Sequence, residues 1–301
     1  MMAASPHTSR LALGTVQFGL PYGYGNAGRA VSRAEAARIL VLAWERGIDM
    51  LDTAVDYGES ESIIGAAKPK EARFKIVSKV PRIGKDRIAA GDLEKIRAAA
   101  YASLKRLKIE YLDALLVHHA PDLLAPGGAK IFEILQALKS EGIVRRLGVS
   151  VYEPDVLRRI LDLYPIEVAQ LPLNLLDQRF ARDGLRELAR RGIEVHARSV
   201  FLQGVLLADP AGLPSRFEAV CSRLSRLRAQ AKSEGIAVQT IALGYVAAQH
   251  EVGRIVIGVQ SADELQANIA AFTAIPPRFG VDFSAYGIDD LEVIDPRRWT
   301  R

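Results

Sequence analysis

The feature that most constrains the fold of this chain is an alternation, from end to end, of short apolar runs with helical windows. Several of the runs are almost continuously apolar, which is typical of parallel strands that are covered on both faces. The eight runs are Leu11–Thr15, Ile48–Asp52, Phe74–Lys79, Leu112–His118, Leu147–Ser150, Val168–Leu171, Ile193–Ser199 and Arg254–Gly258. We therefore expect a parallel sheet with helical crossovers between its strands.

Helical periodicity fills the segments between these runs and also follows the last of them. The windows are Ser32–Arg46, Ser60–Ala67, Asp92–Leu107, Ala129–Ser140, Pro154–Leu163, Arg182–Arg190, Val238–Gln249 and Ala262–Phe272. Eight strands that alternate with helices predict an α/β fold of the closed (β/α)8 barrel type, a TIM barrel. An open doubly wound sheet is the alternative.

Local residues support the boundaries of these elements. Ser32, followed three residues later by Glu35, forms the pattern of a capping box at a helix start. Gly47, Gly142 and Gly192 each stand between a helical window and a strand, where a left-handed C-cap is expected. Pro154 suits the first turn of a helix.

The totals of the sequence predict one globular domain over residues 1–301. Hydrophobic residues make up 49% of the chain and charged residues 25%, with no linker or repeat. The single cysteine, Cys221, excludes an internal disulfide and fits a reducing, cytoplasmic location. The net charge of +5 arises from scattered basic residues, so we expect no nucleic-acid partner. We also expect no membrane association, because the most apolar window is too short to span a bilayer and no signal segment precedes the first strand.

Polar residues stand at the carboxyl end of every predicted strand. Barrel active sites lie at this end, on the strand tips and the loops that follow them. The residues are Thr15, Gln17, Asp52, Lys79, His118, Ser150, Gln170, Asn174, Arg198, Ser199, Gln260 and Ser261. A barrel without a site would not require so many polar groups at one rim.

The order of these motifs resembles the aldo-keto reductase superfamily over nearly the whole chain, from about Leu11 to Ala271. The segment 51–61 (LDTAVDYGESE) resembles the family signature around the second strand, and Ser78-Lys79 resembles the family lysine at the end of the third. Asp113, followed five residues later by His118, resembles the family's histidine motif at the end of the fourth strand. Residues 148–150, 170–174 and 257–268 resemble the family's motifs at the fifth strand, at the sixth strand and at the final cofactor loop, respectively.

This resemblance implies hydride transfer between a nicotinamide cofactor and a small aldehyde, ketone or sugar. It places the catalytic roles on Asp52, Tyr57, Lys79 and His118. A carbonyl that receives hydride needs a proton donor at its oxygen, and Tyr57 would supply that proton. Lys79, held by Asp52, is expected to lower the pKa of the tyrosine, while His118 would orient or polarise the carbonyl. The neighbouring His119 should point to the opposite face of its strand.

The resemblance also predicts the residues that contact the cofactor. They are Gly14, Thr15, Val16, Asp52, Ser150, Gln170, Arg198, Ser199, Phe201, Gly204, Gly258, Gln260, Ser261, Glu264 and Asn268. The last loop holds Gln260, Ser261 and Glu264 where NADP(H)-selective members place cations, so we expect NAD(H) to be favoured, with NADP(H) as the alternative. No histidine lies at ligand spacing from another ligand group, and we expect no metal.

Arg198 departs from the family pattern, which often places an aromatic side chain there against the nicotinamide. Its guanidinium would stack on the ring and disfavour the cationic, oxidised form of the cofactor. The alternative is an arginine at the rim that pairs with a carboxylate.

Two other hypotheses about the function remain open. The scaffold is also compatible with a regulatory protein that binds NAD(H) and a protein partner with little or no turnover. A phosphate-binding barrel isomerase is a third class, but it does not account for the order of the four catalytic positions. The substrate itself would be selected by the mouth loops, residues 20–29, 120–128 and 201–215, and by the tail after Pro276.

The run from Gly23 to Gly28 spells GxGxxG, the dinucleotide fingerprint, in the wrong context. Pro21 follows the strand and the helix starts beyond the last glycine, at Ser32, whereas a true fingerprint joins strand and helix directly. We expect a loop over the barrel mouth, with Tyr22 or Tyr24 near the substrate.

Overall fold

Eight parallel strands close into a barrel in sequence order, and β1 pairs with both β2 and β8. The computed structural model describes residues 8–24 and 28–299. The strands are β1 (Leu11–Gly14), β2 (Met50–Asp52), β3 (Lys75–Val80), β4 (Leu112–Val117), β5 (Val144–Ser150), β6 (Val168–Pro172), β7 (Glu194–Arg198) and β8 (Val252–Gly258). The predicted closed barrel is confirmed, and β5 and β8 begin a little earlier than the sequence indicated.

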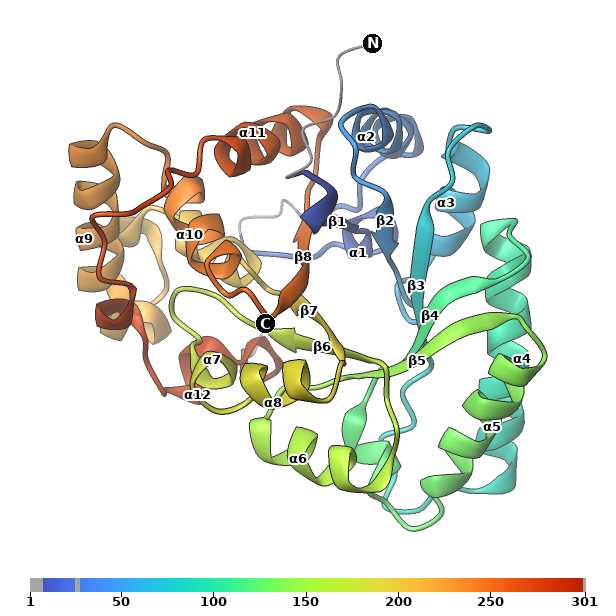
Figure 1. Cartoon of the computed structure of the whole chain (residues 1–301). Coiled ribbons are helices and arrows are strands. Elements are labelled where there is room, and N and C mark those ends of the chain that lie inside the picture. Colours follow the sequence, from blue (N-terminus) through green and yellow to red (C-terminus); the bar gives the residue numbers. More distant parts are fainter. Residues whose placement is uncertain (1–7, 25–27, 300–301) are drawn as a thin grey trace.

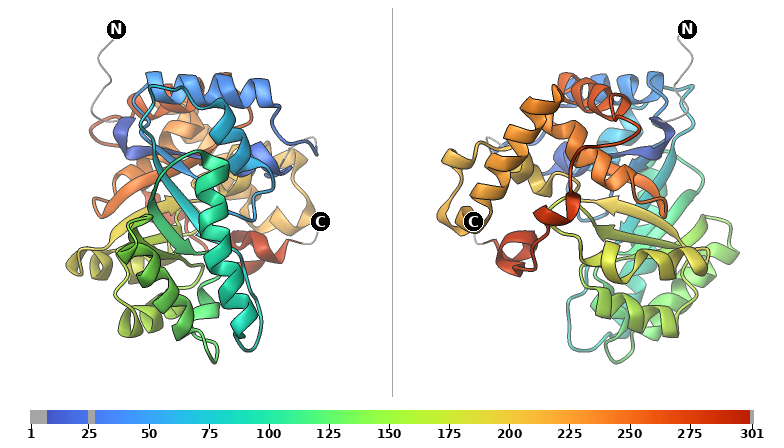
Figure 2. Two further views of the ribbon diagram at one scale, coloured as in Figure 1. Left: turned by 90° about the vertical axis from the view of Figure 1, so that its right-hand side faces the viewer. Right: turned by 60° about the vertical axis from the view of Figure 1, so that its left-hand side comes forward.

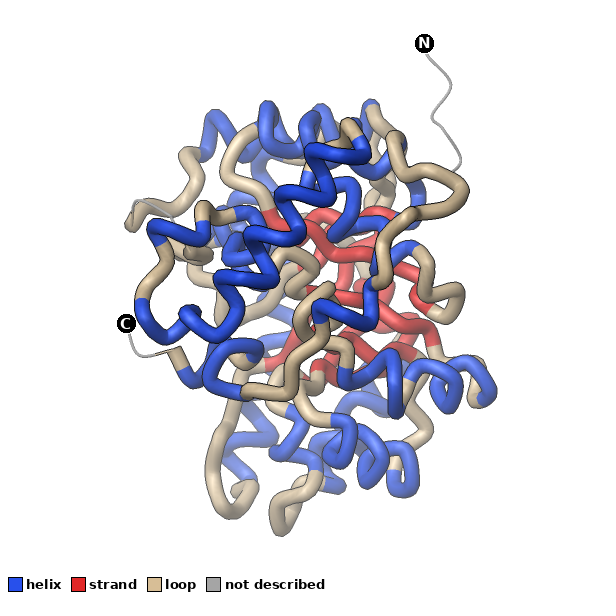
Figure 3. Tube along the Cα trace, turned by 90° about the vertical axis from the view of Figure 1, so that its left-hand side faces the viewer, coloured by secondary structure: helices blue, strands red, loops and turns tan. Residues whose placement is uncertain are grey.

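Helices surround the strands on the outside of the barrel, as Figures 1 and 3 show. They are α2 (Arg33–Glu45), α3 (Ser60–Ala67), α4 (Ala90–Leu107), α5 (Ala129–Ser140), α6 (Pro154–Leu163), α7 (Arg179–Asp183), α8 (Leu185–Arg190), α9 (Glu218–Glu234), α10 (Val238–Ala247) and α11 (Ala262–Thr273). Two short helices, α1 (Val16–Gly19) and α12 (Leu291–Ile294), lie outside this ring of crossovers. Among the described residues, no helix combines the length and the apolar character that a bilayer crossing requires.

The strand period of two decides which side chains point into the barrel. A small apolar cluster fills the barrel interior, formed by Ala12, Met50, Val77, Ala114, Leu116, Val168 and Val256. Two residues further along these same strands are Gly14, Asp52, Lys79, His118, Gln170 and Gly258. Because successive inward side chains are two residues apart, the polar layer lies directly above the apolar one, at the carboxyl ends of the strands.

The local boundary signals act as the sequence indicated. The Ser32 hydroxyl accepts a hydrogen bond from the backbone N–H of Glu35 at the start of α2. Gly47, Gly142 and Gly192 have φ values of 80°, 80° and 68°, which L-residues adopt at a cost. Pro154 occupies the first turn of α6.

Two helical segments differ from the sequence prediction. Helix α9 was not predicted, because its apolar face is narrow: only Val220, Leu224, Leu227 and Ala231 are buried, at helical spacing along an otherwise polar sequence. The window Arg182–Arg190 begins earlier and is interrupted at Gly184, where φ is −138° and α7 gives way to α8.

The C-terminal tail folds back toward the carboxyl end of the barrel and passes close to α9 (Figure 2). Its Trp299 ring packs edge-on against Phe217, with the ring centroids 5.1 Å apart. Arg297 bonds to Asp295 and also to Glu153, which follows β5. These contacts hold residues 295–299 against the barrel rim.

Candidate active site

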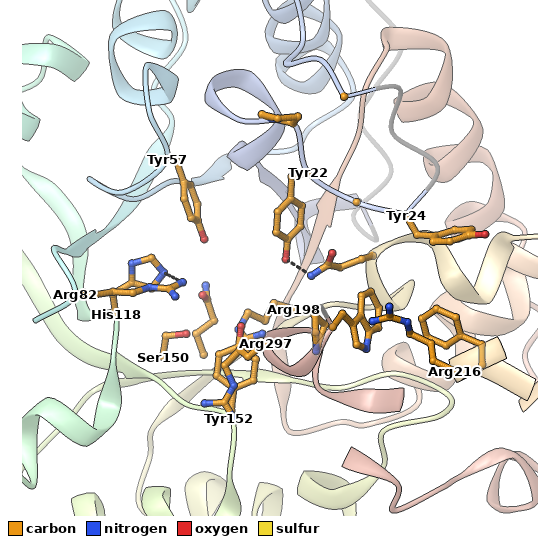
Figure 4. Close-up of a pocket in the computed structure, with 18 of the residues that line it drawn as sticks. Tyr22, Tyr24, Tyr57, Arg82, His118, Ser150, Tyr152, Arg198, Arg216 and Arg297 are labelled. Atoms are coloured by element: carbon orange, nitrogen blue, oxygen red, sulfur yellow. Dashed lines mark hydrogen bonds between the residues drawn. The ribbon is translucent and has the colours of Figure 1, made fainter. Parts of the chain in front are cut away.

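Two adjoining hollows open at the carboxyl end of the barrel. We name the larger one the rim cavity; it has a volume of about 610 Å³. Its lining includes Tyr22, Tyr24, Tyr57, Arg82, His118, Ser150, Tyr152, Gln170, Arg198, Gln203, Arg216, Phe217, Arg297 and Trp299 (Figure 4). The smaller hollow, which we name the strand-end cleft, lies over β1, β7 and β8, and Tyr57 and Arg198 border both.

A buried ion pair lies at the bottom of the site. Lys79 is 1% exposed and its ammonium donates to both Asp52 oxygens, at 2.8 and 2.9 Å, and to the Thr53 carbonyl at 2.9 Å. The Gln170 amide donates to Asp52 Oδ1 at 2.7 Å. A lysine has three N–H donors, and all three are engaged. The position of the ammonium is therefore fixed, and it acts on its neighbours through its charge.

Tyr57 lies on the loop after β2, and its side chain overhangs this pair. The ammonium of Lys79 is 5.0 Å from the Tyr57 ring centroid. The Tyr57 hydroxyl points into the rim cavity and makes no hydrogen bond with any described residue (Figure 4). It is therefore available to a ligand.

The net pKa of Tyr57 is raised in this structure, and the expected lowering by Lys79 stays a prediction. Burial, followed by the Asp52 carboxylate, raises the pKa of the Tyr57 hydroxyl well above its ordinary value. Arg198 and Arg82 are the cations that act in the opposite direction and lower the pKa of the tyrosine.

His118 faces the cavity beside Tyr57, and its ring is edge-on at a centroid distance of 5.7 Å. Its Nε2 lies 3.1 Å from Nη2 of Arg82, and its Nδ1 lies 3.3 Å from Oδ2 of Asp56. Since the guanidinium only donates, Nε2 accepts and Nδ1 carries the proton. Burial lowers the pKa of His118 to about 4, so the ring is neutral near pH 7.

His119 points away from the cavity, as the alternation of side chains along the strand predicts. Its Nδ1 lies 2.9 Å from Oδ1 of Asp122, which also accepts the backbone N–H of Gly84. Asp113, the acidic partner in the fourth-strand motif, bonds to Arg146 at the opposite end of β4. Neither residue belongs to the site.

Most of the predicted cofactor residues line the strand-end cleft. They are Gly14, Thr15, Val16, Asp52, Arg198, Ser199, Phe201, Gly204, Gly258, Gln260 and Glu264. Ser150 and Gln170 instead line the rim cavity, while Ser261 and Asn268 line neither hollow. Sequence reasoning missed Gln203, whose carbonyl accepts the backbone N–H of Tyr24 at 2.6 Å above the cleft.

The polar groups left open here suit a nicotinamide dinucleotide. Oε1 of Gln170 at the rim cavity and Oε1 of Gln17 at the strand-end cleft are buried without a hydrogen-bond partner among the described residues. Buried polar atoms are normally paired, so such atoms at a hollow indicate a missing ligand. An amide at Gln170 is suited to a carboxamide, which offers both a donor and an acceptor.

The backbone between β7 and residue 204 also lies close to this cleft in an uncommon conformation. Ser199, Leu202 and Gln203 have φ values of 57°, 46° and 54°, and Gly204 has 97°. Left-handed backbone at non-glycine residues is costly and concentrates at ligand sites. Here it brings the peptide groups of this segment to the wall of the cleft.

Acidic side chains organise the last loop. The Glu264 carboxylate accepts from the backbone N–H of Gln260 at 2.7 Å, and Glu35 accepts from that of Ala262 at 2.7 Å. The Ser261 hydroxyl caps α11 by accepting from Glu264 N–H at 3.1 Å. The N–H groups that a phosphate would use are thus already satisfied by carboxylates.

Arg198 stands between the two hollows. Its guanidinium donates to the Val151 carbonyl at 3.0 Å and to the Ser199 hydroxyl at 3.3 Å, and it lies 3.9 Å from the centroid of the Tyr152 ring. Within residues 8–24 and 28–299 it forms no ion pair. The alternative of a rim arginine paired with a carboxylate is therefore wrong.

Several wall residues were missed by the sequence reasoning. Arg82 follows Lys79 by three residues, so extending the strand-end rule into the next loop would have found it. The same extension would have found Tyr152, which follows Ser150 by two residues. Arg297 and Trp299 lie in the tail after Pro276, which the sequence analysis predicted to help select the substrate without naming these two residues. The predicted mouth loop 120–128 contributes nothing to the described lining of the cavity.

The GxGxxG segment forms part of the cavity wall. Tyr22 accepts from the Gln203 side chain at 3.0 Å, and the Tyr24 hydroxyl donates to the Gly212 carbonyl at 2.9 Å. Both tyrosines line the rim cavity, as expected, while residues 25–27 lie outside the described part of the chain.

Among the described residues, no cluster of three or more histidine, cysteine or acidic side chains has the arrangement of a metal site.

Comparison with known proteins places the chain in a family. The model of the aldo/keto reductase family matches residues 10–277. An NADH-specific methylglyoxal reductase of Escherichia coli is 27% identical, with 87% of this chain and 89% of the relative covered. A D-threo-aldose 1-dehydrogenase of a Pseudomonas species is 28% identical, with 88% and 92% covered.

Solved structures share the fold. An aldo-keto reductase of Bacillus halodurans in its holo form superposes with a TM-score of 0.70 at 24% identity, over 89% of this chain and 88% of that one. A glycerol dehydrogenase of Gluconobacter oxydans gives 0.66 at 23% identity, over 91% and 94%. The chain therefore belongs to the aldo/keto reductase family and is an NAD(P)(H)-dependent oxidoreductase.

Proposed function

We propose that the protein reduces a small aldehyde, ketone or sugar carbonyl with NADH, and that Tyr57 donates the proton. The observation that carries this proposal is the Tyr57 hydroxyl, which faces the rim cavity without a partner above the buried Asp52–Lys79 pair. A regulator without turnover would not require this arrangement. An assay of NADH oxidation with methylglyoxal and a set of aldoses tests the proposal, and no turnover with any carbonyl would contradict it.

The bound nicotinamide would supply hydride to the carbonyl carbon. Thr15, Gly258 and the segment 198–204 would hold the dinucleotide along the strand-end cleft, and Gln170 and Ser150 would fix the carboxamide end. Tyr57 would donate a hydrogen bond to the carbonyl oxygen and then its proton to the alkoxide that forms. The fixed ammonium of Lys79 would stabilise the phenolate left behind.

His118 would act on the substrate through Arg82, because its neutral ring has no N–H directed at the carbonyl oxygen. Its Nδ1–H lies beside Asp56, so Nε2 faces Arg82 as an acceptor. Arg82 would then orient the substrate together with His118. Since burial raises the pKa of Tyr57, the hydroxyl carries its proton at neutral pH and is available as a donor.

We expect NAD(H) to bind more tightly than NADP(H). Glu264 and Glu35 occupy the backbone N–H groups of the last loop and would repel a 2′-phosphate. Replacing Ser261 by Lys and Glu264 by Arg should move the ratio of the two dissociation constants toward NADPH by about tenfold or more, because a charge-assisted contact contributes roughly 1.5–3 kcal/mol.

Fluorescence titration with NADH, NADPH and NAD⁺ measures these affinities. Tighter binding of NADPH by the unaltered protein would contradict the role given to the two carboxylates. The same titration tests Arg198, which should make NADH bind better than NAD⁺ because a cation near the nicotinamide opposes the oxidised charge.

The depressed pKa of His118 predicts how activity and stability depend on pH. Its value in the folded protein is about 4, against an ordinary value of 6.5. As the pH falls, His118 therefore takes up a proton in the unfolded chain before it does so in the folded protein. The stability that the neutral His118 contributes is present above about pH 6.5 and is lost as the pH falls toward 4. Turnover of an uncharged aldehyde should show no step from His118 between about pH 6 and 8, since a ring with a pKa of about 4 stays neutral in that range.

The measurements are kcat/KM and the urea midpoint as functions of pH. In His118→Asn the loss of stability between about pH 6.5 and 4 should be smaller, because the titrating ring is gone. An acid limb of kcat/KM with an apparent pKa near 6.5 that disappears in this variant would show that His118 titrates near its ordinary value in the folded protein and would refute the prediction.

A further inference from the structure

The charged side chains that face the rim cavity are all cationic. Arg82, Arg198, Arg216 and Arg297 line it, His118 is neutral, and no aspartate or glutamate of the described residues is part of its wall. These arginines come from four separate parts of the chain, which Figure 4 shows arranged around one space. A cavity of this kind holds a positive potential.

Arg297 does not contribute a free charge to this potential. Its guanidinium bonds to Asp295 at 2.9 and 3.0 Å through Nε and also pairs with Glu153. Two carboxylates thus neutralise it from behind the wall. Its function in the cavity is to hold the tail and to lie against Tyr152, 3.9 Å from that ring's centroid.

Arg198 is different, because no carboxylate in the described chain pairs with it. Of the residues that the structure describes, only Ser199, through its hydroxyl, and Val151, through its carbonyl, accept from the five donors of this guanidinium. Val151 and Tyr152 fix its plane on one side. A partly buried cation without a counter-charge is unfavourable unless a ligand supplies one.

Arg82 provides a second cation on the side of Tyr57 and His118. Its nearest carboxylate is Asp56, with 3.9 Å between Nε and Oδ2, and its short contact is with the neutral imidazole of His118. Arg82 and Arg198 line the same cavity as Tyr57, on different sides of its hydroxyl (Figure 4), and both lower the pKa of that group. The two cations therefore flank the proton donor.

Building on the proposed function, we propose that the substrate is an anionic carbonyl compound, whose carboxylate or phosphate is held by Arg198 and Arg82 while its carbonyl faces Tyr57. Guanidinium groups bind either oxyanion through paired N–H donors. Tyr22, Tyr152, Phe217 and Trp299 would enclose the remainder of the molecule. A volume of about 610 Å³ is ordinary for a small organic ligand.

The binding test uses three ligands that share one ring: benzoate, phenylphosphonate and the uncharged benzamide. Calorimetry with the NADH-loaded protein at low salt should show at least one anion binding about tenfold or more tightly than benzamide. The stronger of the two anions identifies the source as carboxylate or phosphate. Equal affinity for all three ligands would overturn the proposal.

Single arginine substitutions test which side chains bind the anion. Arg198→Gln and Arg82→Gln should each weaken anion binding about tenfold and leave benzamide affinity little changed. Arg190→Gln removes the same charge from the exposed surface of α8, where Arg190 pairs with Glu187, and should change nothing. Tighter anion binding that neither cavity variant weakens would place the anion elsewhere and would overturn the proposal.

The turnover test compares 4-carboxybenzaldehyde with its uncharged methyl ester. The ratio of their kcat/KM values should favour the acid about tenfold or more, and this ratio should collapse in Arg198→Gln whatever happens to the absolute rates. A ratio near one would overturn the proposal. If neither aldehyde is reduced, the proposed function fails for this substrate class, while the calorimetry still decides whether the cavity holds an oxyanion.

Discussion

Replacing Tyr57 by phenylalanine should lower kcat about 10²–10⁴-fold and leave the affinity for NADH nearly unchanged. The hydroxyl points into the rim cavity and makes no bond within the described chain, so its removal leaves no protein group without a partner. The loss then reports on proton donation in the transition state. Single-turnover oxidation of NADH and a fluorescence titration measure the two quantities.

A matched control removes a tyrosine hydroxyl outside the cavity. Tyr164 donates to the Leu123 carbonyl at 2.8 Å and packs against Phe132, so Tyr164→Phe should affect stability more than rate. A Tyr57→Phe enzyme that keeps more than about a tenth of the normal rate would assign the proton to another group, because a positioned acid is worth far more than that.

Replacing Lys79 by methionine should abolish turnover and also destabilise the fold. The variant loses the cation that stabilises the phenolate, and it leaves Asp52 buried with only the Gln170 amide as a side-chain donor. Breaking a buried ion pair on one side costs roughly 3–5 kcal/mol. The free energy of unfolding from urea titration and the turnover rate measure the two losses.

A double variant separates the two losses. Asp52→Asn combined with Lys79→Met removes both charges of the pair and should recover much of the lost stability. It should not recover turnover if the Lys79 charge acts on Tyr57. Recovery of activity in this charge-free variant would mean that the pair serves only the fold.

The closed barrel was predicted from the alternation of apolar runs with helical windows, and the candidate catalytic residues were predicted from the polar strand ends and the family resemblance. Period-two alternation puts Asp52, Lys79, His118 and Gln170 on the inward faces of neighbouring strands, above Met50, Val77, Leu116 and Val168. Because strand direction and side-chain parity are local properties, reading each strand separately was sufficient. The same alternation predicts that His119 points away from the cavity, and its ring lies beside Asp122 instead.

Other features depend on contacts between distant parts of the chain, which no local pattern encodes. The pKa of Tyr57 is raised because the cavity buries it and Asp52 lies near, although the sequence pointed only to Lys79. Arg297 reaches the rim through Glu153, 144 residues earlier in the chain. Helix α9 escaped prediction for a local reason, since few of its residues are apolar.

The return of the tail to the rim affects how the protein can be altered. Phe217 and Trp299 share one wall, yet no residue from 296 to 299 touches the Asp52–Lys79 pair. Selectivity could therefore be altered by exchanging this short segment with the chemistry left in place. For the same reason, any insertion or substitution within residues 296–299 changes a wall of the cavity.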